Sequence, residues 1–369
     1  MKAWVRSHLN LLTQLEDDHR ELFQDHKGRR SSQADQFGDP FGPRKIGRCL
    51  NSIWRPDRCL NASYSRSTAN WKPENTMPYE EHMTRENPSA ILFLRDISDS
   101  MGEEFGGENS KTKAERLNTA LNRQIANITI ACAKSGEEVR DYFDVGVVEY
   151  QGGNVDSAWT GDLSGRDLVP VSDLKDNPLR VETRTVEKVD DAGQVREVET
   201  KFPVWFEPQN GSGTPMCEAL KFSYDLLEPW VDQHQDSFPP LVINVTDGRA
   251  TDGDPQPGAE KLQSLSTNDG NVVLFNIHIS SVNHPPTIFP ASKSQLPSEH
   301  SARLFEMSSP LPSVYQKGIQ KKGYEVTSDS RGYVFHAGAV EMVQTIQTLI
   351  GTPKKQIKGK VTPPNEGKL

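Results

Sequence analysis

Five oxygen-bearing side chains, carried by three separate segments of the 369-residue chain, have the types and spacing needed to bind a divalent cation. Asp96, Ser98 and Ser100 form an Asp-x-Ser-x-Ser motif directly after an apolar run. Thr214 ends a Gly-Ser-Gly-Thr segment, and Asp247 lies in a Thr-Asp-Gly segment after a second apolar run. Two carboxylates and three hydroxyls, without a thiolate or an imidazole, suit Mg²⁺ or Mn²⁺ better than zinc.

The five side chains also suggest how such a metal would act. If Ser98, Ser100 and Thr214 bind it directly while Asp96 and Asp247 act through waters, all protein ligands of the metal are neutral. The metal then stays electrophilic and favours a carboxylate from another protein as a further ligand. The alternative is that Asp96 and the serines only cap a turn and a helix, with no metal bound.

Short apolar runs alternate with segments of helical periodicity over most of the chain. The sequence therefore predicts an α/β fold, a doubly wound and mostly parallel sheet flanked by helices. The predicted strands are Ala90–Arg95, Tyr142–Tyr150, Leu241–Thr246, Val272–Ile279 and Gly332–His336, and the predicted helices cover residues 114–132 (with Ser110 as a cap), 216–227 and 339–350. Ligands of such sheets bind beyond the carboxyl ends of the strands, so the three polar segments should converge there.

The predicted domain, residues 89–351, is flanked and interrupted by other segments. Residues 1–88 read as an irregular extension with one amphipathic helix, and residues 352–369 as a basic tail. Two insertions without predicted helices, at about 151–210 and 281–330, are candidates for partner contact. The first should contain a β-hairpin, with strands Val181–Val189 and Gln194–Phe202 around Asp-Asp-Ala-Gly.

Composition excludes several functional classes. The net charge is −9, with 14 Lys and Arg against 12 Asp and Glu in residues 1–88 and therefore −11 in the remainder, which argues against nucleic-acid binding. No apolar run approaches the roughly 18 residues needed to cross a membrane, and the first residues lack the pattern of a secretory signal. We therefore expect a cytoplasmic protein whose four scattered cysteines are reduced.

The three motifs together resemble the von Willebrand factor A domain and its metal-ion-dependent adhesion site. In that family the Asp-x-Ser-x-Ser loop follows the first strand, the threonine opens a central helix, and the aspartate follows the fourth strand. Asp96, Ser98, Ser100, Thr214 and Asp247 match that pattern residue by residue. Asp99 departs from it, because the family often has glycine at this place.

The resemblance implies a non-enzymatic, protein-binding module that uses Mg²⁺ or Mn²⁺ to hold a Glu or Asp of its partner. Segments such as Ser212–Met216 look most like those of bacterial TerY-like proteins. Those proteins are associated with tellurite resistance and with stress or defence systems, alongside a protein kinase and a metal-dependent phosphatase. The resemblance therefore suggests a kinase or a phosphatase as the partner.

Two further functions stay open from the sequence. One is a Mg²⁺-dependent phosphotransferase or hydrolase of doubly wound fold with Asp96 as nucleophile, although Ser98 stands where a second acid would be expected. The other is a scaffold in which the metal site is vestigial and the extension and hairpin bind the partner. His278 lies in a predicted strand and is interpreted as a histidine of the core or of the rim of the sheet rather than a ligand.

Overall fold

The structure is a computed structural model that describes residues 78–104, 111–133, 138–189, 195–280 and 284–336, with Thr345 and Thr348. The predicted extension lies outside the described residues as far as residue 77, and the predicted basic tail lies wholly outside them. Of the helix predicted over residues 339–350, only Thr345 and Thr348 are described, and both are helical and buried.

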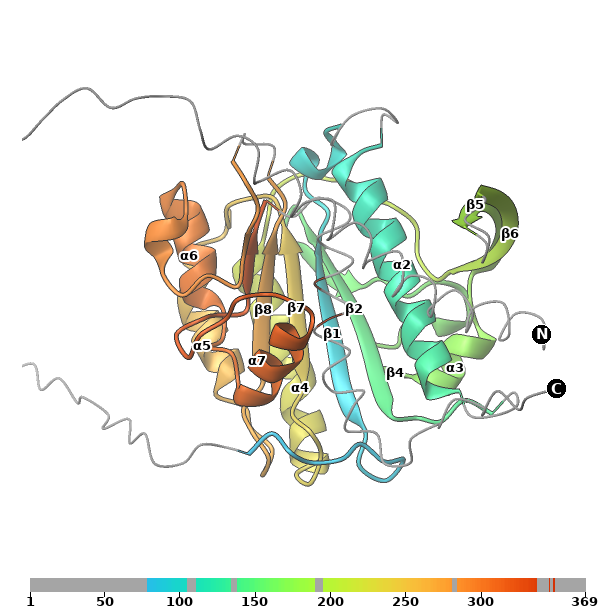
Figure 1. Ribbon diagram of the computed structural model, residues 1–369, viewed down its shortest axis with the longest axis horizontal. Coiled ribbons are helices and arrows are strands. Elements are labelled where there is room, and N and C mark those ends of the chain that lie inside the picture. The colour runs from blue at the N-terminus through green and yellow to red at the C-terminus, as the bar shows by residue number, and fades with distance from the viewer. Residues whose placement is uncertain are drawn as a thin grey trace, which may run out of the picture. The chain divides into compact units, whose positions relative to one another are not determined.

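A single mixed sheet forms the centre of the described part of the chain (Figure 1). Its strands lie in the order β3-β2-β1-β7-β8-β10-β9, with β4 also paired to β2. The pairs among β2, β1, β7, β8 and β10 are parallel, whereas β3, β4 and β9 are antiparallel edge strands. The bounds are β1 Ser89–Asp96, β2 Phe143–Gln151, β3 Asn154–Ser157, β4 Val169–Pro170, β7 Leu241–Thr246, β8 Val273–His278, β9 Thr287–Ile288 and β10 Tyr333–Phe335. The predicted doubly wound, mostly parallel architecture is confirmed.

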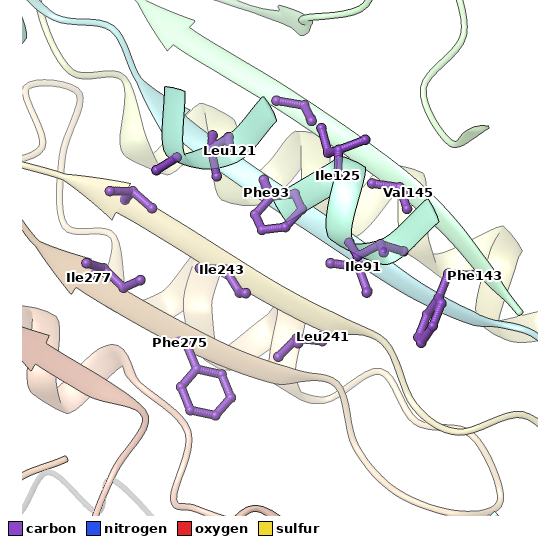
Figure 2. Packing of buried hydrophobic residues seen from close by; sticks show 14 of the residues in the cluster. Ile91, Phe93, Leu121, Ile125, Phe143, Val145, Leu241, Ile243, Phe275 and Ile277 are labelled. Atoms are coloured by element: carbon purple, nitrogen blue, oxygen red, sulfur yellow. The ribbon is translucent and has the colours of Figure 1, made fainter. Parts of the chain in front are cut away.

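The central strands are continuous apolar runs because both of their faces are covered. All eight residues of β1 are buried, and alternate side chains enter different clusters. Ile91 and Phe93 belong to the cluster on one face, and Leu92 and Leu94 to the cluster on the other. Figure 2 shows Phe93 of β1 beside Ile125 of a covering helix. This pattern is what strands buried on two sides require.

Helices cover the two faces as separate layers. On the face of Ile91 lie α2 (Lys113–Cys132), α3 (Val171–Asp176) and α7 (Ser313–Lys321). On the face of Leu92 lie α4 (Met216–Gln233), α5 (Gln256–Gln263) and α6 (Glu299–Met307). The chain goes from β1 to β2 on one side and returns to β7 on the other side of β1. This reversal of strand order is where α/β sheets place their ligands.

The start of α2 differs from the prediction. Its N-cap is Thr112, not Ser110, which lies outside the described residues. The Thr112 hydroxyl accepts a hydrogen bond from the Glu115 N–H, and the Glu115 carboxylate accepts one from the Thr112 N–H. This reciprocal pair fixes the first turn and makes Lys113 the first helical residue.

The two insertions contain more structure than predicted. The hairpin is confirmed as β5 (Arg180–Val189) and β6 (Val195–Val204), and its turn lies outside the described residues. The expectation that residues 281–330 lack helices is wrong, because α6 and α7 lie there, and α3 lies in the first insertion. These helices have at most nine residues, fewer than the roughly 11 to 18 over which a helical period can be recognised in a sequence.

Residues just before β1 are hydrogen-bonded to the loop that precedes β8. This loop lies at the amino ends of the parallel strands, whereas the three polar segments lie at their carboxyl ends. The Tyr79 N–H donates to the Asp269 carbonyl at 3.0 Å, and the Tyr79 hydroxyl donates to the Asn271 carbonyl at 3.2 Å. The Glu80 N–H donates to the Asp269 carboxylate at 2.8 Å. Asp269 and Asn271 precede β8, so the chain enters the domain at the amino ends of the strands.

Candidate metal centre

The five predicted ligands lie at the carboxyl ends of β1 and β7, an edge that we call the carboxyl edge. Asp96 ends β1, and Ser98 and Ser100 occupy the turn that follows, which includes a short 3-10 helix, η1 (Asp99–Gly102). Asp247 directly follows β7, the parallel neighbour of β1. Thr214 precedes α4 by two residues. We call these five residues the metal centre.

A chain of hydrogen bonds connects four of the five residues. The Ser98 N–H donates to Asp96 Oδ1 at 2.9 Å. The hydroxyls of Ser98 and Ser100 are 3.2 Å apart, and the Ser100 hydroxyl donates to Asp247 Oδ1 at 2.7 Å. The structure therefore brings together side chains that are about 150 residues apart in the sequence, as predicted from the topology.

Asp96 is fully buried, and its second oxygen is held by a residue that the sequence did not single out as a ligand. The Thr246 hydroxyl donates to Asp96 Oδ2 at 2.5 Å. Burial raises the pKa of Asp96 to about 6, although the hydrogen bonds from Thr246 and Ser98 lower it. A cation at this place would oppose the effect of burial and favour the ionised form of the carboxylate.

Thr214 is held in place by the segment that follows β7. Its N–H donates to the Thr251 hydroxyl at 2.9 Å, and the Thr251 N–H donates to the Thr214 carbonyl, also at 2.9 Å. The Asp252 carboxylate accepts hydrogen bonds from the N–H groups of Cys217 and Glu218 in the first turn of α4. One loop therefore carries Asp247 and also sets the position of Thr214.

Gly248 keeps space open between these ligands. A Cβ atom at Gly248 would lie 3.0 Å from Thr214 Oγ1 and 3.6 Å from Asp96 Oδ2. The Thr214 hydroxyl and the Asp96 carboxylate therefore face the same small space beside a residue without a side chain. Hydroxyl and carboxylate oxygens around such a space fit Mg²⁺ or Mn²⁺, with Ser98, Ser100 and Asp247 as the other candidate ligands.

Lys113 belongs to the same cluster and was not predicted. Its Nζ donates to Asp247 Oδ2 at 2.8 Å, to Glu103 Oε2 at 2.8 Å and to the Ser100 carbonyl at 3.3 Å. Only 4% of the lysine side chain is exposed. Burial lowers the pKa of Lys113, but the bonds to Asp247 and Glu103 outweigh it and the pKa is raised. The lysine therefore places a buried positive charge beside the metal centre.

A buried arginine connects the elements that carry the candidate ligands. Arg95, adjacent to Asp96, forms an ion pair with Glu149 of β2. Its guanidinium also donates to Asn118 Oδ1 of α2 at 2.8 Å and to the Glu207 carbonyl at 3.0 Å. Arg95 thus connects β1, β2, α2 and the segment that leads to Thr214.

The structure also shows the positions of Asp99, His278 and two of the four cysteines. Asp99 is exposed, so its extra charge lies at the surface of the loop. His278 is buried at the end of β8, with Nδ1 3.1 Å from the Tyr333 hydroxyl, and burial lowers its pKa to about 3. Cys132 and Cys217 are free thiols, while Cys49 and Cys59 lie outside the described residues.

The described part of the chain has neither a metal site built from acidic, histidine and cysteine side chains alone nor a membrane-spanning helix. Within these residues no group of three or more His, Cys, Asp or Glu side chains is arranged to hold a metal ion, so a metal at the carboxyl edge would depend on hydroxyl oxygens. None of the helices within the described ranges combines the length and apolar character required to cross a membrane.

Comparison with known proteins adds little. No protein-family model matches the chain, and no curated protein matches it. Among solved structures, the crystal structure of the human COPII-coat protein Sec24c is similar over 52% of this chain and 26% of that chain. The sequence identity is 11% and the TM-score is 0.25. The chain thus spans about a quarter of that structure, and a similarity this low assigns neither family nor function.

Proposed function

We propose that this chain is a non-enzymatic, cytoplasmic module for protein–protein interaction, in which Mg²⁺ or Mn²⁺ at the metal centre holds a Glu or Asp side chain of a partner. The observation that carries the proposal is the meeting of two carboxylates and three hydroxyls, from three distant segments, at the switch point of the sheet. Their order along the chain is that of a von Willebrand factor A domain.

The arrangement of charges supports binding rather than catalysis. The hydroxyls of Ser98, Ser100 and Thr214 are neutral ligands, so a bound metal would keep an affinity for an incoming carboxylate. Asp96, the nucleophile of the phosphotransferase alternative, is completely buried, and both of its oxygens accept hydrogen bonds. A substrate would have to reach this buried carboxylate before Asp96 could attack it.

The partner is proposed from the resemblance to TerY-like proteins. A protein kinase or a metal-dependent phosphatase with an acidic side chain in an exposed loop would meet the chemical requirement. A role in a bacterial stress-response or defence system is part of the same proposal.

Calorimetric titration of the full chain with Mg²⁺ and with Mn²⁺ tests the metal centre. We expect one ion per chain for the wild type and no binding for a Ser98→Ala, Thr214→Ala double variant. The matched control is Ser294→Ala, Thr185→Ala, which removes two exposed hydroxyls elsewhere. Capture of a partner that is released by EDTA and missed by the double variant would extend the result from metal to protein binding.

Other outcomes of this experiment have separate meanings. If the wild type and the control bind no ion, the metal centre is not functional. If metal binds as expected but partner capture is unchanged in the double variant, the scaffold alternative is favoured, because recognition then lies outside the metal centre.

A further inference from the structure

We propose that Lys113 is a built-in competitor for the metal, whose ammonium group neutralises Asp247 in the metal-free protein and must leave that carboxylate when the divalent cation binds. The inference rests on the proposed function, because it concerns the regulation of the same metal centre. It assigns to one lysine the control of metal affinity.

The first support is the position of the ammonium group. Lys113 Nζ lies 2.8 Å from Asp247 Oδ2, while Asp247 Oδ1 accepts the Ser100 hydroxyl at 2.7 Å. Both oxygens of Asp247 are therefore occupied by groups of this chain. Asp247 itself has only 2% of its side chain exposed, so its charge is neutralised by Lys113 rather than by solvent.

The second support is that a lysine at this position does not stabilise its own helix. Lys113 is the first residue of α2, where the helix dipole disfavours a positive charge. The side chain is nevertheless buried and directed to a carboxylate 134 residues away. Its position is explained by the metal centre and not by the helix.

The third support is a second acceptor that can keep the ammonium group after the metal has bound. Glu103 Oε2 lies 2.8 Å from Lys113 Nζ, and 62% of the Glu103 side chain is exposed. The Lys113 N–H donates to the Glu103 carbonyl at 3.0 Å, which keeps the two residues adjacent. Lys113 can therefore leave Asp247 and remain paired with Glu103, without being buried as an uncompensated charge.

Electrostatics then sets the direction of the effect. A divalent cation and an ammonium group that share one buried carboxylate repel each other, in surroundings that screen charges poorly. Replacing Lys113 by glutamine removes this repulsion but leaves a polar side chain. Removing the charge of Glu103 instead confines the ammonium group to Asp247. The two substitutions should therefore change metal affinity in opposite directions.

The test is calorimetric titration with Mg²⁺ on the full chain at neutral pH, for the wild type, Lys113→Gln, Lys113→Arg and Glu103→Gln. We expect Lys113→Gln to bind Mg²⁺ roughly tenfold more tightly, and Glu103→Gln to bind it a few-fold more weakly. Lys113→Arg keeps the charge and should resemble the wild type. Lys111→Gln removes an exposed lysine two residues away and is the matched control.

Thermal unfolding supplies a second readout. In EDTA, Lys113→Gln should unfold at a lower temperature than the wild type, because Asp247 loses its buried partner, and Mg²⁺ should reverse the loss. Should Lys113→Gln fail to fold, the weaker binding expected of Glu103→Gln still decides the question.

The outcomes separate the inference from the proposed function. If Lys113→Gln and the wild type bind Mg²⁺ equally well, or the variant binds it more weakly, the competitor role is wrong and the metal centre stands. If neither binds Mg²⁺, both are wrong. Binding of Mg²⁺ by the wild type, together with tighter binding by Lys113→Gln, would support both.

Discussion

At Asp96, burial and hydrogen bonding act on one carboxyl group in opposite directions. Burial raises its pKa and dominates, while the bonds from Thr246 and Ser98 lower it, and the resulting pKa is about 6. Because 3.8 is the ordinary value, the protonated form is favoured by folding. A raised pKa of this kind contributes stability below pH 3.8 that is lost as the pH rises to about 6.

The metal-free protein should therefore become less stable between pH 4 and pH 7 relative to an Asp96→Asn variant. The shift in pKa corresponds to a relative loss of roughly 3 kcal/mol in the free energy of unfolding. Urea unfolding at several pH values, with metal removed beforehand, measures it. Asp99→Asn, in the same turn but exposed, is the control and should follow the wild type. A difference between wild type and Asp96→Asn that does not vary with pH would contradict the assignment.

Residues in and around the metal centre differ in how readily their roles can be predicted from the sequence. Asp96, Ser98 and Ser100 are close together and follow a strand, so the motif and the sheet topology suffice to place them. Lys113 looks like any solvated lysine at the start of a helix. Its contact with Asp247 depends on how α2 packs against the carboxyl edge, which local patterns do not specify. The contact of Thr246 with Asp96 was not predicted either, although Thr246 belongs to the Thr-Asp-Gly segment.

At the scale of elements, the loops of the metal centre are held by a polar network beneath them. Arg95 connects β1 to β2 through Glu149 and to α2 through Asn118. It also holds the Glu207 carbonyl, in the segment that leads to Thr214. Correct placement of the ligands therefore depends on a residue that is not itself a candidate ligand.

Replacing Arg95 by alanine should destabilise the protein by about 3 kcal/mol, because Glu149 and the Glu207 carbonyl lose a buried partner. The exposed pair of Arg85 and Glu138, 3.8 Å apart, provides the control. Arg85→Ala should cost less than about 1 kcal/mol. Urea unfolding of the two variants compares the costs directly, and equal losses would show that the Arg95 network does not support the fold.

Elements were predictable to the extent that burial leaves a pattern in the sequence. The prediction of β7 was correct to the residue, and the other central strands were predicted to within one residue at each end, because they are apolar on both faces. Helix α4 runs to Gln233, beyond the predicted end at Leu227 and through Pro229, since Trp230 and Val231 are also buried. Short helices such as α6, with nine residues, have too few turns for their helical period to be recognised in the sequence.

At the scale of the whole described domain, the metal centre joins elements of different layers. Asp96 belongs to β1 and Asp247 follows β7, whereas Thr214 leads into α4 on one face. Lys113 begins α2 on the other face. A metal bound at the carboxyl edge would therefore act as a cross-link between the sheet and the helical layer that contains α4.

Mg²⁺ should accordingly slow hydrogen exchange of amides in three segments, residues 96–103, 211–217 and 246–252, while strand interiors change little. At about one hundred times the dissociation constant, the ion should add roughly 2.7 kcal/mol to the free energy of unfolding. Exchange measured by mass spectrometry with and without Mg²⁺ tests this, and the Ser98→Ala, Thr214→Ala variant should show no change. Protection confined to one segment would argue against a shared site.

The hydrogen bonds of Tyr79 determine the direction in which a pulling force would act on the domain. The chain enters where Tyr79 and Glu80 are bonded to Asp269, at the amino end of the sheet, while the metal centre lies at the other end of β1. The eight residues of β1 span roughly 26 Å at about 3.3 Å per residue. A pulling force between residue 78 and the metal centre would run lengthwise along β1. It would load the parallel ladders with β2 and β7 in shear, so that their hydrogen bonds resist together instead of opening one after another.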